Sequence, residues 1–116
     1  MKINSISGVT YLVADIDKTA EFYEALGFRM GKREEGRLTC YVNWFSVTFV
    51  AEDAAPSNKG AGVLLHLKVD DIDGCHTELV EAGMAPMGEP TKTAPGRREF
   101  VLRDPDGYEL VFFAKK

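Results

Sequence analysis

The sequence predicts an α+β protein made of two tandem copies of one β-α-β-β-β module. Sliding the chain against itself by 56 residues aligns "VADIDKTAEFYEALGF" (13–28) with "VDDIDGCHTELVEAGM" (69–84), and this offset is close to half of the 116 residues. Each aligned segment is followed by three strand-like stretches separated by turn-forming residues. Self-similarity at such a period is typical of a duplicated supersecondary unit.

A strand and a helix open each module. The strands, 8–14 and 63–69, alternate in polarity and run into the acidic segments 15–17 and 71–73, which suit a helix N-cap and the positive end of the helix dipole. Helical spacing then places one face at Ile16, Thr19, Tyr23 and Leu26, and in the second module at Ile72, Cys75, Leu79 and Ala82. Gly27 and Gly83 supply the left-handed residue that ends each helix.

Three strands complete each module. The predicted strands are 29–35, 37–44, 46–52, 86–93, 97–103 and 108–114. Hairpin turns are expected at "EEG" (34–36) and "PDG" (105–107). The chain is therefore expected to form one domain, with module 1 at about 1–52, a linker at about 53–61 and module 2 at about 62–116.

Composition excludes several classes of function. The chain is 45% hydrophobic and carries a net charge of −4, which opposes binding to nucleic acids and to anionic membranes. No apolar run is long enough for a membrane helix, and the N-terminus lacks the features of a secretory signal. Two cysteines do not make a disulfide framework, so we expect a reducing compartment and a cytoplasmic protein.

Two motifs resemble a known superfamily. "FYEALGF" closes the first helix and "RDPDGYELVFF" spans the last hairpin, and together with the duplicated V-x-D-I-D helix start they are similar to the vicinal oxygen chelate superfamily. Its members include glyoxalase I, extradiol dioxygenases, fosfomycin-modifying enzymes and bleomycin-resistance proteins. The resemblance covers essentially the whole chain. It implies an open, curled mixed β-sheet whose concave face holds a divalent metal or an organic ligand.

The metal ligands that this resemblance implies are missing from the sequence. The family places a His at the start of the first strand of a module and a Glu on the last strand. Gly8 and Leu64 occupy the two His positions, Val111 occupies one Glu position, and the stretch 47–51 offers no carboxylate or imidazole for the other. A divalent metal needs several converging oxygen or nitrogen donors. We therefore expect no metal and no other cofactor.

Strand alternation predicts which residues line the concave cleft. Core positions are expected at Val9, Tyr11, Val13, Leu38, Cys40, Val42, Val63, Leu65, Leu67, Val69, Phe100, Leu102, Leu110 and Phe112. The predicted ligand-binding residues are Thr10, Tyr41, Asn43, Phe49, His66, Glu99, Glu109, Val111 and Phe113. This wall mixes apolar surface with a few polar groups, as small-molecule sites do.

Each polar candidate also has a structural interpretation. His66 lies in an apolar run where a histidine often serves packing alone, and Glu109 follows a turn where a solvated charge is common. Tyr41 and Phe113 are either core residues or stacking platforms for a ligand. The arginines of the strand 97–103 are expected to form a solvated edge. Trp44 and Phe45 suit a dimer contact or a lid.

Two functions remain open. The first is a metal-free protein that sequesters a small organic ligand, similar to the bleomycin-resistance branch. The second is a glyoxalase-like lyase or isomerase, or a dioxygenase, in which His66 and Glu109 replace the usual ligands of Zn, Mn, Ni or Fe, or in which acid–base chemistry proceeds without a metal. The missing ligands favour the first. The family resemblance and the open sheet edges also predict a homodimer, and Thr10, His66 and Glu109 are expected to share one cleft.

Overall fold

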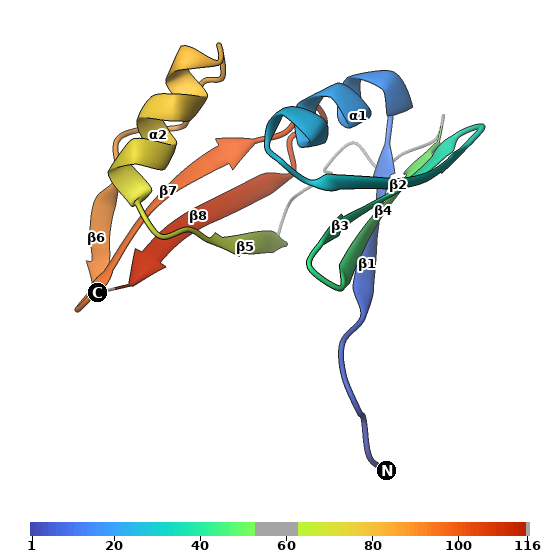
Figure 1. Cartoon of the computed structure of the whole chain (residues 1–116), viewed down its shortest axis with the longest axis horizontal. Coiled ribbons are helices and arrows are strands. Elements are labelled where there is room, and N and C mark those ends of the chain that lie inside the picture. Colours follow the sequence, from blue (N-terminus) through green and yellow to red (C-terminus); the bar gives the residue numbers. More distant parts are fainter. Residues whose placement is uncertain (53–62, 116) are drawn as a thin grey trace. The chain divides into compact units, whose positions relative to one another are not determined.

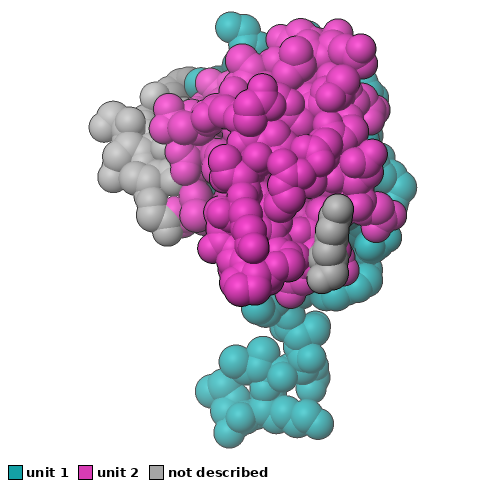
Figure 2. Space-filling view, turned by 90° about the vertical axis from the view of Figure 1, so that its left-hand side faces the viewer, with its two compact units in different colours: residues 1–59 teal, residues 60–116 magenta. Residues whose placement is uncertain are grey.

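The computed structural model describes residues 1–52 and 63–115 of the chain. The chain divides into two compact units, residues 1–59 and residues 60–116 (Figure 2). Each unit has one helix and one four-stranded mixed sheet (Figure 1), which confirms the predicted α+β fold of two β-α-β-β-β modules. The predicted linker, 53–61, lies outside the described residues. In the described part, no helix has the length and apolar character needed to cross a membrane.

Unit 1 contains the first five elements of the chain. In chain order they are β1 (Gly8–Val13), α1 (Ile16–Ala25), β2 (Arg29–Glu34), β3 (Arg37–Val42) and β4 (Phe45–Ala51). The sheet order is β1-β4-β3-β2, in which β1 runs parallel to β4 and the other pairs are antiparallel.

Unit 2 repeats this arrangement. Its elements are β5 (Leu64–Lys68), α2 (Ile72–Glu81), β6 (Thr91–Ala94), β7 (Arg97–Arg103) and β8 (Glu109–Lys115). The sheet order is β5-β8-β7-β6, and β5 runs parallel to β8. The crossover from β5 through α2 corresponds to the one from β1 through α1, so the repeat in the sequence is a repeat of topology.

The helix ends follow the predicted capping residues. Asp15 Oδ1 accepts hydrogen bonds from the backbone N–H groups of Asp17 and Lys18 at 2.9 and 3.2 Å, and Asp71 Oδ1 accepts one from Gly74 at 3.0 Å. These carboxylates satisfy amide groups that the first turn of a helix leaves without partners.

Each helix covers one face of its own sheet, and the core of each unit lies between them. In unit 1 the ring of Tyr23 on α1 packs against Phe49 with 4.6 Å between centroids. In unit 2 Phe100 and Phe112 stack at 5.0 Å beneath α2. Most of the predicted core positions are buried, among them Tyr11, Val13, Leu38, Cys40, Phe100, Leu102, Leu110 and Phe112. We call the face of each sheet opposite its helix the open face.

Four local predictions are wrong. The strand expected at 86–93 begins only at Thr91, because Pro86 and Pro90 have no N–H for a strand ladder. Val42 and Val63, predicted in the core, are exposed, since the first ends β3 beside a turn and the second precedes β5. Ala82 is exposed because it is the C-cap of α2.

The "DPDG" segment forms a turn that its first aspartate holds together. Asp104 is buried, and its Oδ1 accepts hydrogen bonds from the backbone N–H groups of Asp106 and Tyr108, both at 2.9 Å. The backbone of Asp104 donates to Tyr108 O and accepts from Gly107, which closes the turn. The motif that carried the family resemblance therefore sets the geometry between β7 and β8.

Candidate functional site

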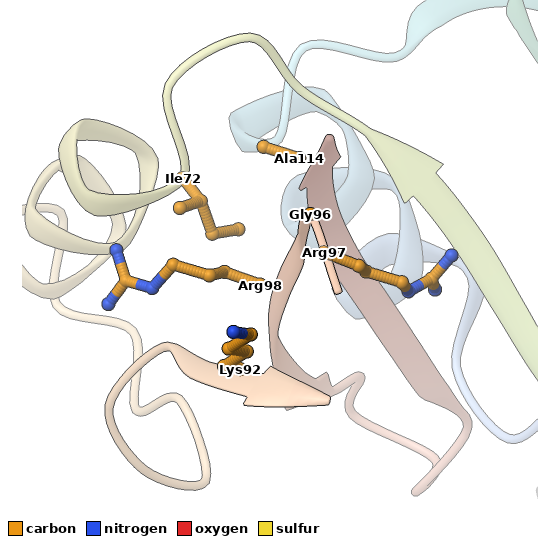
Figure 3. Close-up of a pocket in the computed structure, with 6 residues that line it drawn as sticks. All are labelled: Ile72, Lys92, Gly96, Arg97, Arg98 and Ala114. Atoms are coloured by element: carbon orange, nitrogen blue, oxygen red, sulfur yellow. The ribbon is translucent and has the colours of Figure 1, made fainter. Parts of the chain in front are cut away.

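Polar side chains gather at one end of the open face of unit 2. Adjacent residues of β7 point to opposite sides of the sheet, as Figure 3 shows for Arg97 and Arg98. Arg98 extends toward α2 and pairs with Asp73, whereas Arg97 extends to the other side. Arg97 and Glu99 of β7, His66 of β5 and Phe113 of β8 therefore share the open face.

Arg97 is held by three contacts on this face. Its Nε donates to Glu99 Oε1 at 3.0 Å, its Nη2 lies 3.0 Å from His66 Nδ1, and its guanidinium carbon lies 4.0 Å above the centroid of the Phe113 ring. Only 23% of the side chain is exposed. A guanidinium fixed by a stacked ring and two hydrogen bonds loses little conformational freedom when it binds a further group.

Glu99 is fixed in its turn by β6. Thr93 Oγ1 donates to Glu99 Oε1 at 2.8 Å, and 22% of the Glu99 side chain is exposed. The hydrogen bond from Thr93 lowers the pKa of Glu99, and Arg97 and His66 lower it further, while burial acts in the opposite direction. Glu99 is therefore a carboxylate throughout the neutral range.

The contact between Arg97 and His66 determines the tautomer of the imidazole. An arginine side chain has only donors, so His66 Nδ1 must be the acceptor. In the neutral ring the proton then resides on Nε2, which becomes a donor directed away from Arg97. The ring of His66 also meets the edge of Phe113, with 6.2 Å between centroids.

Glu109 belongs to a different pair on the same face. Arg103 Nε donates a hydrogen bond to Glu109 Oε2 at 3.1 Å, and Arg103 Nη2 lies 3.1 Å from the same oxygen in an ion pair. The β7–β8 register sets Arg103 opposite Glu109, whereas Glu99 is the carboxylate that hydrogen-bonds the Arg97 side chain in contact with His66. Val111 of β8 is in register with His66 and is buried.

Two cavities open in unit 2 near this cluster. The first has a volume of about 250 Å³, and its lining includes Met87, Thr91, Thr93, Glu99 and Val101. The second, drawn in Figure 3, has a volume of about 170 Å³ and lies beside the start of α2. Only the first is lined by the carboxylate of the cluster, so it is the space available to a ligand that contacts Glu99.

The open face of unit 1 carries the remaining predicted residues. Thr10 is exposed beside Thr48, whose hydroxyl lies 3.3 Å from that of Thr39. The guanidinium carbon of Arg29 lies 4.6 Å above the ring of Tyr41, as Arg97 lies above Phe113. That Thr10 shares one cleft with His66 and Glu109 stays a prediction.

Two residues predicted in the cleft occupy other places. Phe49 is fully buried on the helix-covered face, because the β1–β4 register sets it beside Tyr11 and under Tyr23. Asn43 lies in the turn between β3 and β4 with φ +55°, a left-handed conformation that Asn tolerates, so it is not part of a strand face. Neither side chain contributes to the open face.

The family's metal positions have no ligating side chains in the structure either. Gly8 lies against β4, where an added Cβ would be 2.2 Å from Ser46 Oγ and 2.6 Å from Ser46 O. Leu64 is exposed, Val111 is buried, and register places Thr48 at the remaining position. Among residues 1–52 and 63–115, no three His, Cys, Asp or Glu side chains are grouped so as to hold a metal. The side chains at these four positions do not supply the ligands that a divalent cation needs.

The sequence did not identify Arg97 as the residue that contacts the other three members of the cluster. The arginines of 97–103 were expected to form a solvated edge, but only 23% of the Arg97 side chain is exposed. Its contacts depend on the pairing of β7 with β6 and β8, where a bulge between Lys92 and Ala94 brings Thr93 to Glu99. No spacing in the sequence signals that arrangement.

One family model matches most of the chain. The profile of the Glyoxalase/Bleomycin resistance protein/Dioxygenase superfamily matches residues 3–112. A glyoxalase/bleomycin resistance protein/dioxygenase from Nocardioides superposes with a TM-score of 0.83 at 18% identity, over 99% of this chain and 85% of that one. A sequence comparison with curated proteins found no match.

Two further solved structures resemble the chain to a similar degree. A virulence protein from Salmonella typhimurium gives a TM-score of 0.81 at 21% identity, over 100% of both chains. A glyoxalase/bleomycin resistance protein/dioxygenase from Alicyclobacillus acidocaldarius gives 0.78 at 16% identity, over 97% of this chain and 92% of that one. At these identities the likeness describes the fold.

Proposed function

Since the chain belongs to the Glyoxalase/Bleomycin resistance protein/Dioxygenase superfamily, we propose that it binds a small organic molecule, without a metal ion, at the polar cluster on the open face of unit 2. The cluster consists of His66, Arg97, Glu99 and Phe113. The observation that carries the proposal is that each polar group of this cluster is already held in position by another. A site of this kind binds without first ordering its side chains.

The surroundings of the cluster support a ligand of modest size. A cavity of about 250 Å³ adjoins Glu99 and has both threonine hydroxyls and apolar side chains on its walls. On β5, Leu64 lies two residues before His66, on the same face of the sheet as His66, and is 50% exposed. Apolar surface beside a few oriented polar groups is the usual composition of a small-molecule site.

Metal chemistry is not part of the proposal because of the side chains at the family's ligand positions. Gly8, Leu64 and Val111 have no donor atoms, and Thr48 offers a single hydroxyl. The lyase, isomerase or dioxygenase alternative would have to recruit His66 and Glu109, but their contacts are to Arg97 and Arg103. A guanidinium against each of these groups disfavours a cation between them.

The proposal is tested by titrating a library of small neutral, cationic and anionic aromatic compounds into chelator-treated ¹⁵N-labelled protein. We expect compounds that raise the melting temperature to shift the backbone amide signals of His66, Glu99 and Phe113. A ligand at a hundred times its Kd adds about 2.7 kcal/mol to the free energy of unfolding. Phe113→Leu should weaken these compounds, whereas Trp44→Leu, an exposed aromatic residue outside the cluster, should not.

Two results would contradict this function. In the first, binding compounds leave the amides of the open face unmoved, which would place the site elsewhere. In the second, binding requires added Zn²⁺, Mn²⁺, Ni²⁺ or Fe²⁺ and is lost again with chelator. That second result would favour the enzyme alternative.

We also propose that the protein is a homodimer. Each four-stranded sheet ends in two outer strands, and such edges commonly pair with another chain or are covered by one. Trp44, at the tip of the turn between β3 and β4, is 68% exposed, and aromatic residues are enriched at interfaces. Sedimentation equilibrium at tens of micromolar should give twice the monomer mass of 12.8 kDa. A monomer at that concentration contradicts the proposal.

A cytoplasmic location is the last part of the proposal. It is supported by the two cysteines, Cys40 and Cys75, which are both free thiols in the structure. Free buried thiols are typical of reducing compartments. Fractionation of cells with an antibody to the protein should place it in the cytoplasmic fraction, and recovery from an oxidising compartment would contradict this.

A further inference from the structure

The donors at the cluster on the open face of unit 2 point to a particular class of ligand. Arg97 uses Nε and Nη2 for Glu99 and His66, and among residues 1–52 and 63–115 its Nη1 has no acceptor. His66 Nδ1 accepts from Nη2, so Nη1 is the end of the guanidinium left for a ligand. A permanently charged donor of this kind suits an anionic acceptor.

Most of the charged side chains at this end of the sheet are cationic. Lys68 pairs in register with Phe113, and Lys115 pairs in register with Arg97, so both lie on the open face beside the cluster. The three cationic residues, Lys68, Arg97 and Lys115, outnumber the one carboxylate, Glu99. This local excess of positive charge contrasts with the net charge of −4 of the whole chain and attracts anions to this end of the sheet.

Glu99 does not cancel this preference. Its Oε1 accepts from both Thr93 Oγ1 and Arg97 Nε, which directs the carboxylate at the Nε side of the guanidinium. The Nη1 end is left for another partner. Glu99 therefore acts as a positioning residue that holds the fork of Arg97 in place.

We infer that the ligand of the proposed site carries a carboxylate, which Arg97 Nη1 binds, next to an apolar body that packs on Leu64. This inference rests on the proposed function and names the chemical class of its ligand. A carboxylate is favoured over a point-like anion because its two oxygens match the N–H groups of a planar guanidinium. Leu64 supplies exposed apolar surface on the same face as His66.

The test compares three probes of nearly the same shape: phenylacetate, phenylacetamide and phenethylamine. Each is titrated into ¹⁵N-labelled protein, and the Kd is taken from the amide shifts of His66, Arg97 and Glu99. We expect phenylacetate to bind about tenfold or more tightly than phenylacetamide, since its hydrogen bonds are charge-assisted, and phenethylamine to bind most weakly. Raising the salt concentration should weaken phenylacetate alone.

Variants of β7 separate recognition by Arg97 from general charge. Arg97→Met keeps an apolar chain over Phe113 and should remove the preference for phenylacetate, whereas Arg97→Lys should retain part of it. Arg103→Met is the matched control, because Arg103 is another ion-paired arginine on the same face of the same strand. It should retain the whole preference, and the folding of every variant is checked by its amide spectrum.

The outcomes distinguish this inference from the proposed function. Equal binding of phenylacetamide and phenylacetate, or an equal loss of the preference in Arg97→Met and Arg103→Met, overturns the carboxylate assignment. If phenylacetamide or phenethylamine shifts the cluster amides as strongly as phenylacetate does, the proposed small-molecule function is supported, but the assignment of an anionic ligand is rejected. If no probe shifts them and the wider library also leaves them unmoved, the function falls with the inference.

Discussion

Removing the carboxylate of Asp104 should destabilise unit 2 without touching the open-face cluster. Asp104 Oδ1 accepts from the backbone N–H groups of Asp106 and Tyr108, both at 2.9 Å, and Asp104 is only 6% exposed. Asp104→Ala leaves both donors without this acceptor. Water can reach the N–H of the half-buried Asp106, but not that of Tyr108, which is buried.

The expected cost follows from this asymmetry. An unsatisfied buried amide costs about 1–3 kcal/mol, and a lost hydrogen bond to a charged group that water can replace costs about 1 kcal/mol. Asp104→Ala should therefore lower the free energy of unfolding by about 2–4 kcal/mol. Asp104→Asn keeps an oxygen at the same place and loses only the charge, so it should cost about 1 kcal/mol.

Urea denaturation followed by far-ultraviolet circular dichroism measures these differences, with unchanged m values as the check on two-state unfolding. Glu35→Ala is the control, because Glu35 is an exposed carboxylate in the hairpin turn between β2 and β3. It should change the stability by less than about 0.5 kcal/mol. An Asp104→Ala protein as stable as the control, or an Asp104→Asn protein as unstable as Asp104→Ala, would refute the reasoning.

Three further predictions concern Thr19, Glu99 and Cys40. Thr19 Oγ1 is buried and has no hydrogen-bond partner among residues 1–52 and 63–115, so Thr19→Val should raise the free energy of unfolding by about 1 kcal/mol in urea; Thr19→Ser, which keeps the hydroxyl, should not. Because the folded pKa of Glu99 is lowered, its contribution is present above the unfolded value of about 4.3 and is lost as pH falls through the folded pKa. The difference in melting temperature between wild type and Glu99→Gln should thus be constant at neutral pH and shrink only in acid; a change near pH 7 contradicts this assignment. Burial raises the pKa of the Cys40 thiol to about 11, so a maleimide at pH 8 should label Cys40 only as fast as the protein unfolds; rapid labelling of the folded protein would refute it.

The repeat and its local signals were enough to determine the fold. The acidic caps Asp15 and Asp71, the helical spacing after them and the glycines at 27 and 83 depend on neighbours within a few residues, and each helix begins and ends where they predict. Strand alternation likewise placed Thr10, His66 and Glu99 on the face opposite the helix. The first part of the segment 86–93 is not a strand, because Pro86 and Pro90 have no N–H for a strand ladder, and the strand begins at Thr91.

The partners of the site residues were decided by the tertiary structure alone. Phe49 lies in a strand, "FSVTFVA", with little polar alternation, so only its register beside Tyr11 shows that it faces α1. His66 meets Arg97, 31 residues away, because the sheet order places only β8 between β5 and β7. Thr93 meets Glu99 where the β6–β7 register shifts between Lys92 and Ala94. Through the period of two, a sequence specifies which face of the sheet a strand residue occupies. Pairing register and bulges determine which charged groups come into contact, and these are properties of several strands together.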